Sequence, residues 1–190
     1  MVDEHPKFPK PVLIVALTLS GLLALGVITL GLVSRFSEQR EQDAVEAAQQ
    51  ARRTGPLALP PIPSPDAEEP DCAKLLAALP AELDVDGAPV PRRDLAEPIP
   101  PGAVAWGDAE HDPITVRCGL SAPAELTPTS PLVDISGVSW LRITEAGNTS
   151  WLAVDRPVYV ALTAPENSGS GPVQDLSAQL RTLPKQPVFP

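Results

Sequence analysis

The chain has 190 residues, of which 25 are proline and only 4% are aromatic, a composition that disfavours a large helical bundle. The net charge is −10, and the whole acidic excess lies in residues 54–190, which contain 18 acidic and 8 basic side chains. Nucleic acids and anionic lipid headgroups attract clustered Lys and Arg, so we expect no nucleic-acid partner.

The first predicted element is an uncharged apolar segment of 22 residues, Val12–Val33, which follows a short tail, residues 1–11. At about 1.5 Å per residue, a helix of this length spans about 33 Å, close to the thickness of a bilayer's hydrocarbon core. The apolar region of a cleaved signal peptide is usually about 7–15 residues long and ends at small residues. Here the run is longer and continues into Ser34 and Arg35. The segment therefore predicts a single-pass transmembrane helix that acts as a signal anchor.

The basic residues on the two sides of this segment nearly balance, so they do not decide its orientation. Long downstream domains cross the membrane largely regardless of flanking charge. A pair of cysteines in the downstream region also favours an oxidising compartment. We expect a cytoplasmic N-terminus in the cell membrane and an extracytoplasmic C-terminal domain.

Two segments separate the predicted anchor from the folded region. Residues 34–53 contain mostly good helix formers without a continuous apolar stripe, which predicts a helical juxtamembrane spacer. Residues 54–70 contain six prolines, which predicts an extended Pro-rich stalk. The alternative for this second segment is a Pro-rich docking ligand. Together the segments would hold the domain away from the bilayer.

From residue 71 to residue 190 the pattern is that of a folded domain. Helical spacing of apolar residues predicts a first helix with Asp71 as its N-cap and a second helix near the C-terminus. The first helix would present Cys72, Leu75, Leu76, Leu79 and Leu83, and the last Val173, Leu176, Leu180 and Leu183. Alternating segments predict strands at Ala103–Trp106, Ile114–Leu120, Val138–Thr144, Ser150–Asp155 and Val158–Ala164, with a hairpin turn at 145–148. This order predicts an α+β fold, a small two-layer domain of antiparallel sheet and helix.

Cys72 and Cys118 are the only cysteines, and each falls on the apolar face of its predicted element. Two side chains that point into one core can meet, so we predict a disulfide whose loop closure contributes about 4 kcal/mol. Two reduced core cysteines are the alternative. A metal site is disfavoured because zinc takes about four ligands and no further His or Cys lies within reach in the sequence. We expect no metal and no cofactor.

The folded region contains six short motifs, which follow one another along the chain. They are Cys72–Pro80, Ala105–Gly107, Val116–Gly119, Leu126–Ser130, Gly137–Trp140 and Val154–Arg156. In sequence and in order these motifs resemble the actinobacterial membrane proteins grouped as domain of unknown function 3515. The resemblance implies an exported, membrane-tethered domain with a paired cysteine, and it implies no activity.

The sequence contains few groups that could support catalysis. His5 lies in the predicted cytoplasmic tail, so a Ser-His-Asp hydrolase would have to use His111. That residue lies in an acidic, turn-rich stretch that predicts a solvated loop. A cation site would use Asp108, Glu110 and Asp112, but no Gly-centred calcium loop accompanies them. We therefore predict that the protein is not an enzyme.

A binding surface is the favoured kind of site, because Trp and Arg are common interface anchors. The candidate residues are Trp106, Arg117, Thr129, Ser130, Trp140 and Arg156. At least two of the three tryptophans are expected in the core, since a small domain needs large apolar side chains. The predicted function is a non-enzymatic interaction or accessory module of a cell-envelope complex, with another envelope protein as partner. The alternative is a small-ligand-binding or sensor domain.

Overall fold

The computed structural model describes residues 45–50 and 53–189. The chain divides into two compact units, Met1–Gln49 and Gln50–Pro190. In the first unit, residues 45–49 are helical and their side chains are exposed. The predicted tail, the anchor Val12–Val33 and the first part of the spacer lie outside the described residues. Within the described parts of the chain, no helix is long and apolar enough to cross a membrane.

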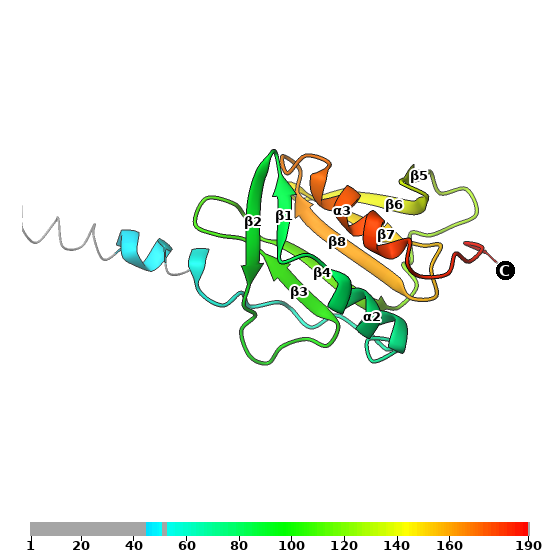
Figure 1. The fold of residues 1–190 in the computed structure, drawn as a ribbon, viewed down its shortest axis with the longest axis horizontal. Helices are drawn as coiled ribbons and strands as arrows, with labels where there is room; N and C mark the ends of the chain where they lie inside the picture. Colours follow the sequence, from blue (N-terminus) through cyan, green and yellow to red (C-terminus); the bar gives the residue numbers. More distant parts are fainter. Residues whose placement is uncertain (1–44, 51–52, 190) are drawn as a thin grey trace, which may run out of the picture. The chain divides into compact units, whose positions relative to one another are not determined.

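The second unit is built on a curled sheet of eight antiparallel strands in the order β1-β2-β3-β4-β8-β7-β6-β5 (Figure 1). The strands are β1 (Glu82–Val85), β2 (Ala88–Arg93), β3 (Ala103–Trp106), β4 (Ile114–Leu120), β5 (Leu132–Ile135), β6 (Val138–Glu145), β7 (Asn148–Ala153) and β8 (Tyr159–Pro165). Each half of the sheet is a meander of four consecutive strands. The pairing of β4 with β8 joins the two halves, with Val116 opposite Leu162. The α+β class with an antiparallel sheet is therefore confirmed.

Three hairpins of the sheet use the same two-residue turn. The central pairs are Asp86-Gly87, Ser136-Gly137 and Ala146-Gly147, and all six residues have φ between +51° and +85°. Two positive φ angles give the turn whose twist matches that of the flanking strands. Only the last of these hairpins was predicted from the sequence pattern. Strands β1, β2 and β5 were not predicted, although Asp-Gly and Ser-Gly pairs mark two of their turns.

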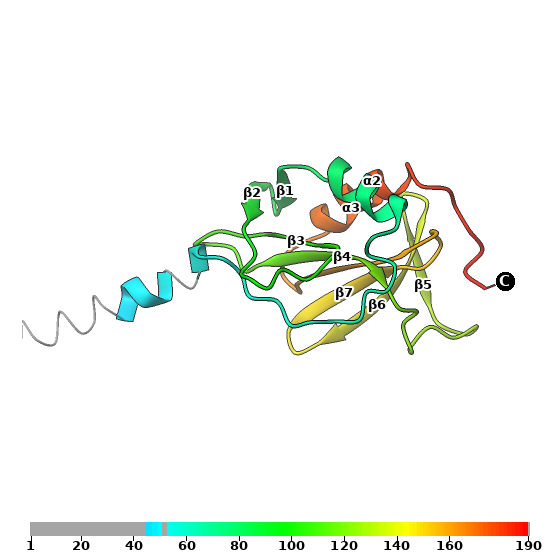
Figure 2. The ribbon, with the colours of Figure 1, turned by 90° about the horizontal axis from the view of Figure 1, so that it is seen from below.

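Two helices, α2 (Pro70–Ala78) and α3 (Gly171–Leu180), lie on one face of the sheet (Figure 2). The main core lies between these helices and the sheet, where Leu75 and Leu176 pack with β-strand side chains. The N-cap of α2 is Glu69, not the predicted Asp71. The helix ends at Ala78 because Pro80 cannot continue it, so Leu83, predicted on this helix, belongs to β1.

The opposite face of the sheet carries a second, smaller apolar cluster. Its buried members are Leu120, Leu141, Leu152, Val154 and Ala161. Strict alternation over the predicted strand Ile114–Leu120 would place Leu120 on the same face as Cys118. A register shift between these two residues moves Leu120 to the second face instead. Strict alternation fails here because a bulge inserts one residue into the strand.

Residues 55–67, called the strap below, correspond to most of the predicted stalk. The strap packs against the folded unit: the Leu57 N–H donates to Asp94 O at 2.8 Å, and the Ala96 N–H donates to Leu57 O at 2.9 Å. Further along, the Asp66 N–H donates to Gly119 O at 3.0 Å. The expectation of a stalk separate from the domain is therefore not met. Proline has no N–H group, but the residues between the prolines keep theirs. The N–H groups of Leu57 and Asp66 donate to backbone carbonyls of the folded domain.

At its end the strap passes directly over Gly119. This glycine has φ +80°, and a Cβ placed on it would overlap the backbone of Asp66 and Ala67. Only a residue without a side chain allows the two backbones to approach this closely. The strap then leads directly into α2.

Candidate functional site

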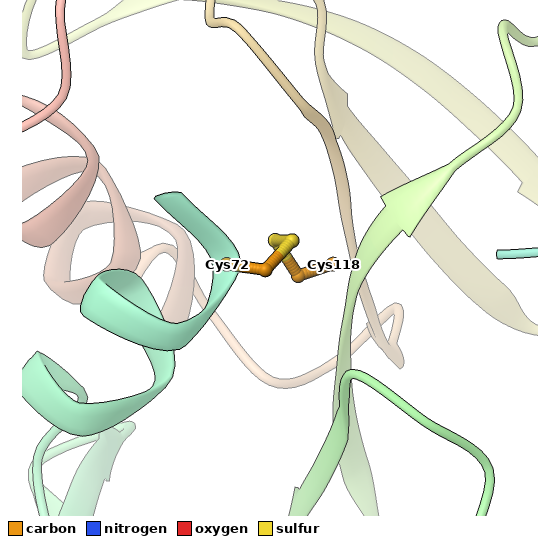
Figure 3. The surroundings of a disulfide bond; sticks show 2 residues. All are labelled: Cys72 and Cys118. Carbon is orange, nitrogen blue, oxygen red and sulfur yellow. A yellow bond between two sulfur atoms is a disulfide. The ribbon is translucent and has the colours of Figure 1, made fainter. Parts of the chain in front are cut away.

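The predicted disulfide is confirmed (Figure 3). Cys72 of α2 and Cys118 of β4 are both fully buried, and their Cα atoms are 5.6 Å apart. The disulfide joins α2 to the central strand β4. Cys118 is the residue before Gly119, where the strap crosses this strand. The pair is structural, since neither sulfur is exposed.

The predicted Trp–Arg surface is wrong, because its aromatic residues are in the core. Trp106 and Trp140 are fully buried, which confirms that at least two tryptophans are core residues. The Trp106 indole N–H donates to Pro80 O at 3.2 Å. The Trp140 indole N–H donates to Ser177 Oγ at 3.0 Å. Each indole N–H is therefore hydrogen-bonded inside the domain and is not available to a partner protein.

The two arginines of the predicted patch are also buried. Arg117 Nη2 donates to Pro60 O in the strap at 2.8 Å, and burial lowers the pKa of this guanidinium. Arg156 donates to Leu180 O at 2.9 Å and to Gly137 O at 3.1 Å. Both side chains hold distant backbone segments together. Sequence patterns could not show this, because the carbonyl partners come from remote parts of the chain.

Thr129 and Ser130 lie in the loop between β4 and β5. Ser130 Oγ donates to Glu125 O at 2.8 Å and accepts the N–H of Thr127 at 2.9 Å. These bonds stabilise the loop itself. The six predicted residues therefore do not form one surface.

An apolar groove lies between the strap and the loop that joins β2 to β3. It has a volume of about 360 Å³. Apolar residues that line it include Leu59, Pro61, Ile62, Pro98, Ile99 and Pro101. Ile62 is 46% exposed and Ile99 is 50% exposed, so both walls present a large apolar side chain to solvent.

The walls of the groove are held in place by hydrogen bonds. The two bonds of Leu57 fix the strap to residues 94–96, where the second wall begins. In that wall, Glu97 Oε2 accepts the N–H of Ile99 at 3.3 Å. Glu97 is the one charged side chain among the described residues that line the groove. The groove is therefore a preformed apolar surface with a negative charge at its side.

A family model described as "Protein of unknown function (DUF3515)" matches residues 23–188. The chain belongs to this family. The match agrees with the resemblance of the six motifs and extends through the strap and the groove. Comparison with the curated proteins and with the solved structures gave no match.

The groove of this DUF3515 chain has a local signal in the sequence, although no site was predicted from it. Both exposed isoleucines are flanked by prolines, in Pro61-Ile62-Pro63 and in Pro98-Ile99-Pro100. The first of these was interpreted only as part of a stalk. Nothing local shows that two segments so far apart in the sequence form opposite walls of one groove.

The acidic loop between β3 and β4 does not form the metal site considered above. Asp108 Oδ1 accepts the backbone N–H groups of Glu110 and His111, each at 2.8 Å, and contacts His111 Nδ1 at 2.9 Å. Burial raises the pKa of Asp108, but these hydrogen bonds outweigh it and lower the pKa overall. Within residues 45–50 and 53–189, no group of three or more His, Cys, Asp or Glu side chains could hold a metal ion.

Proposed function

We propose that this DUF3515 chain is a non-enzymatic module of the cell envelope that binds an apolar segment of a partner protein in its groove. The observation that carries the proposal is the groove itself, with Ile62 and Ile99 exposed on facing walls. Concave apolar surfaces left open to solvent are typical of binding sites. Covering an isoleucine side chain fully contributes about 1.5–3 kcal/mol.

The rigidity of the groove favours binding. Prolines occupy both walls, and a proline ring fixes the backbone φ angle. Two backbone hydrogen bonds, one donated by the Leu57 N–H and one accepted by Leu57 O, attach one wall to the start of the other. Less conformational entropy is therefore lost when a partner binds, since the groove is already in its binding shape.

The charge around the groove favours one kind of occupant. Glu97 lies in the groove, and residues 54–190 contain 18 acidic and 8 basic side chains. A second copy of this chain would bring the same negative charge and be repelled. We therefore assign the groove to a short apolar segment of another envelope protein, with Lys or Arg next to its apolar residues.

The proposed location is the outer side of the cell membrane. Its support is the apolar run Val12–Val33, long enough to span a bilayer, and the disulfide between Cys72 and Cys118. Disulfides persist in exported proteins and are rare in reducing compartments. The proposal is a single-pass protein with the DUF3515 domain outside the cytoplasm.

The binding role can be tested with the full chain in lipid nanodiscs. The probes are short synthetic peptides rich in Leu, Ile and Pro, flanked by lysine in one series and by glutamate in the other. We expect tighter binding of the lysine series. Replacing both Ile62 and Ile99 with Ser should weaken this binding about tenfold or more, since two large apolar contacts are removed.

A matched control is Val133→Ser, which removes an apolar side chain that is 41% exposed on β5, outside the groove. It should leave peptide binding unchanged. Glu97→Gln should reduce the preference for lysine-flanked peptides and keep the apolar contribution. Equal binding of both peptide series, or equal loss in the control, would contradict the proposal.

A small apolar ligand is the second candidate for the groove. Its volume of about 360 Å³ supports this, because pockets for small molecules are roughly 300–1,000 Å³. Such a ligand would displace the peptides from the wild-type chain, and its affinity would not change in Glu97→Gln.

A further inference from the structure

Both walls of the apolar groove are attached to the same short part of β4, residues 117–119. The Cys118 N–H donates to Gly102 O at 2.9 Å, directly after the wall formed by the β2–β3 loop. The next residue, Gly119, accepts the Asp66 N–H at 3.0 Å near the end of the strap. Three consecutive residues of one central strand therefore form the common support of the two walls, and the first of them is Arg117.

Arg117 holds the middle of the strap wall. Its Nη2 atom donates to Pro60 O at 2.8 Å. Pro60 lies between Leu59 and Pro61, and both of these residues line the groove. The backbone hydrogen bonds described above attach the two ends of the strap. The guanidinium group therefore fixes the position of the wall between these ends.

The stability of the fold does not account for an arginine at this position. Arg117 is only 7% exposed, and its Nη1 atom is buried without a hydrogen-bond partner among the described residues. None of the ion pairs between described residues includes it. Burying a charged group that is neither paired nor fully hydrogen-bonded lowers the free energy of unfolding. An apolar side chain of similar length would fill the same space without this loss.

We propose that Arg117 is a positioning residue of the groove, which holds the strap wall in the shape that binds the partner and does not stabilise the fold. This inference rests on the proposed binding of an apolar segment in the groove. A wall that is held at its middle loses less conformational entropy on binding than a wall attached only at its ends. Arg117 is not among the residues that line the groove, so it acts on the partner only through the strap.

The test compares two buried arginines in the full chain in nanodiscs, with the lysine-flanked apolar peptide as the probe. Arg117→Met should weaken peptide binding about tenfold and leave the melting temperature unchanged or higher. Pro60 is exposed, so water can bond to its carbonyl group in this variant. Arg156→Met should have the opposite effects. It lowers the melting temperature, because it removes the closer partner of the buried Asp155 carboxylate, and it leaves the peptide affinity unchanged below that temperature.

Two further measurements separate a positioning role from a general structural one. Arg117→Lys keeps a donor for Pro60 O on a long side chain, so it should recover most of the affinity that Arg117→Met loses. Limited proteolysis without any peptide reports the strap itself. Cleavage near Leu59 should be faster in Arg117→Met than in the wild-type chain. It should stay at the wild-type rate in Arg142→Met, which replaces an exposed arginine of β6.

The outcomes distinguish this inference from the proposed function. If no form of the chain binds the peptides but the strap of Arg117→Met is cleaved faster, the proposed function is wrong and Arg117 still positions the wall. Three results would overturn the inference itself. They are wild-type affinity in Arg117→Met, a loss of melting temperature that accompanies its loss of affinity, and no recovery of affinity in Arg117→Lys.

Discussion

Arg156 connects three parts of the domain through one guanidinium group. It donates to Leu180 O at the end of α3 and to Gly137 O in the β5–β6 turn. Its Nη1 also lies 2.8 Å from Asp155 Oδ1, an ion pair without the alignment of a hydrogen bond. Both charged side chains are almost completely buried. Removing one member of a buried ion pair strongly lowers the free energy of unfolding, because the other charge remains in the interior.

We expect Arg156→Ala to lower the free energy of unfolding by about 3–5 kcal/mol, since it leaves the buried carboxylate of Asp155 with only the longer contact to Lys185 Nζ, at 3.4 Å, and removes the donor to two backbone carbonyls. Arg142→Ala is the matched control. Arg142 is exposed, and its Cζ atom lies 5.7 Å from the centroid of the Trp151 ring. Its loss should cost less than about 1 kcal/mol. Tryptophan fluorescence during urea unfolding of the full chain measures both. Similar values for the two variants would show that Arg156 is not a structural connection.

At the scale of elements, the strap depends on the absence of a side chain at Gly119. Gly119→Ala would place a Cβ against the backbone of Asp66 and Ala67. Gly147 offers a matched control, because it has a similar φ of +79° but a Cβ added there would meet nothing within 4 Å. An alanine at either site is strained by about 1–2 kcal/mol through its positive φ. Only Gly119→Ala should also displace the strap.

Limited proteolysis shows the difference between these two variants. We expect faster cleavage near Ala58 and Leu59 in Gly119→Ala, because the strap loses its contact with β4. Cleavage there should stay at the wild-type rate in Gly147→Ala. If both variants are cleaved alike, the crossing at Gly119 does not hold the strap.

The disulfide is the second feature at this scale. It closes a loop of 46 residues between Cys72 and Cys118. On the chain-entropy model, removing such a link lowers the free energy of unfolding by about 4 kcal/mol. The double variant Cys72→Ala, Cys118→Ala should therefore have a clearly lower melting temperature than the oxidised protein. Reduced wild-type protein should melt close to the double variant, and an unchanged melting temperature would exclude a stabilising role.

At the scale of the whole molecule, the features predicted from sequence were those set by local periodicity. The final helix, β4 and β8 have regular apolar faces, and both cysteines fall on such faces, so their positions and the disulfide were predictable. Leu120 was misplaced because a bulge interrupts the alternation. The functional patch was wrong because burial of Trp106 and Arg117 depends on carbonyls of Pro80 and Pro60, which only the folded topology brings near.

The groove could not be predicted from sequence for the same reason. Its two walls are joined by the pairing of Leu57 with residues 94–96. Each wall alone has the composition of an ordinary Pro-rich linker. Together they give the molecule a rigid apolar surface, and the proposed role of this DUF3515 chain depends on that surface being occupied in the cell.

The most direct test of that role is site-specific photocrosslinking in intact cells. A photoreactive residue at position 99 lies in the groove, and one at position 133 is a control on β5, where the native side chain is similarly exposed. We predict one dominant crosslinked protein from position 99, absent from position 133 and lost when Ile62→Asp is added. The crosslinked peptide should be apolar with an adjacent Lys or Arg. The same products from both positions, or a product that persists with Ile62→Asp, would contradict a groove that binds a partner.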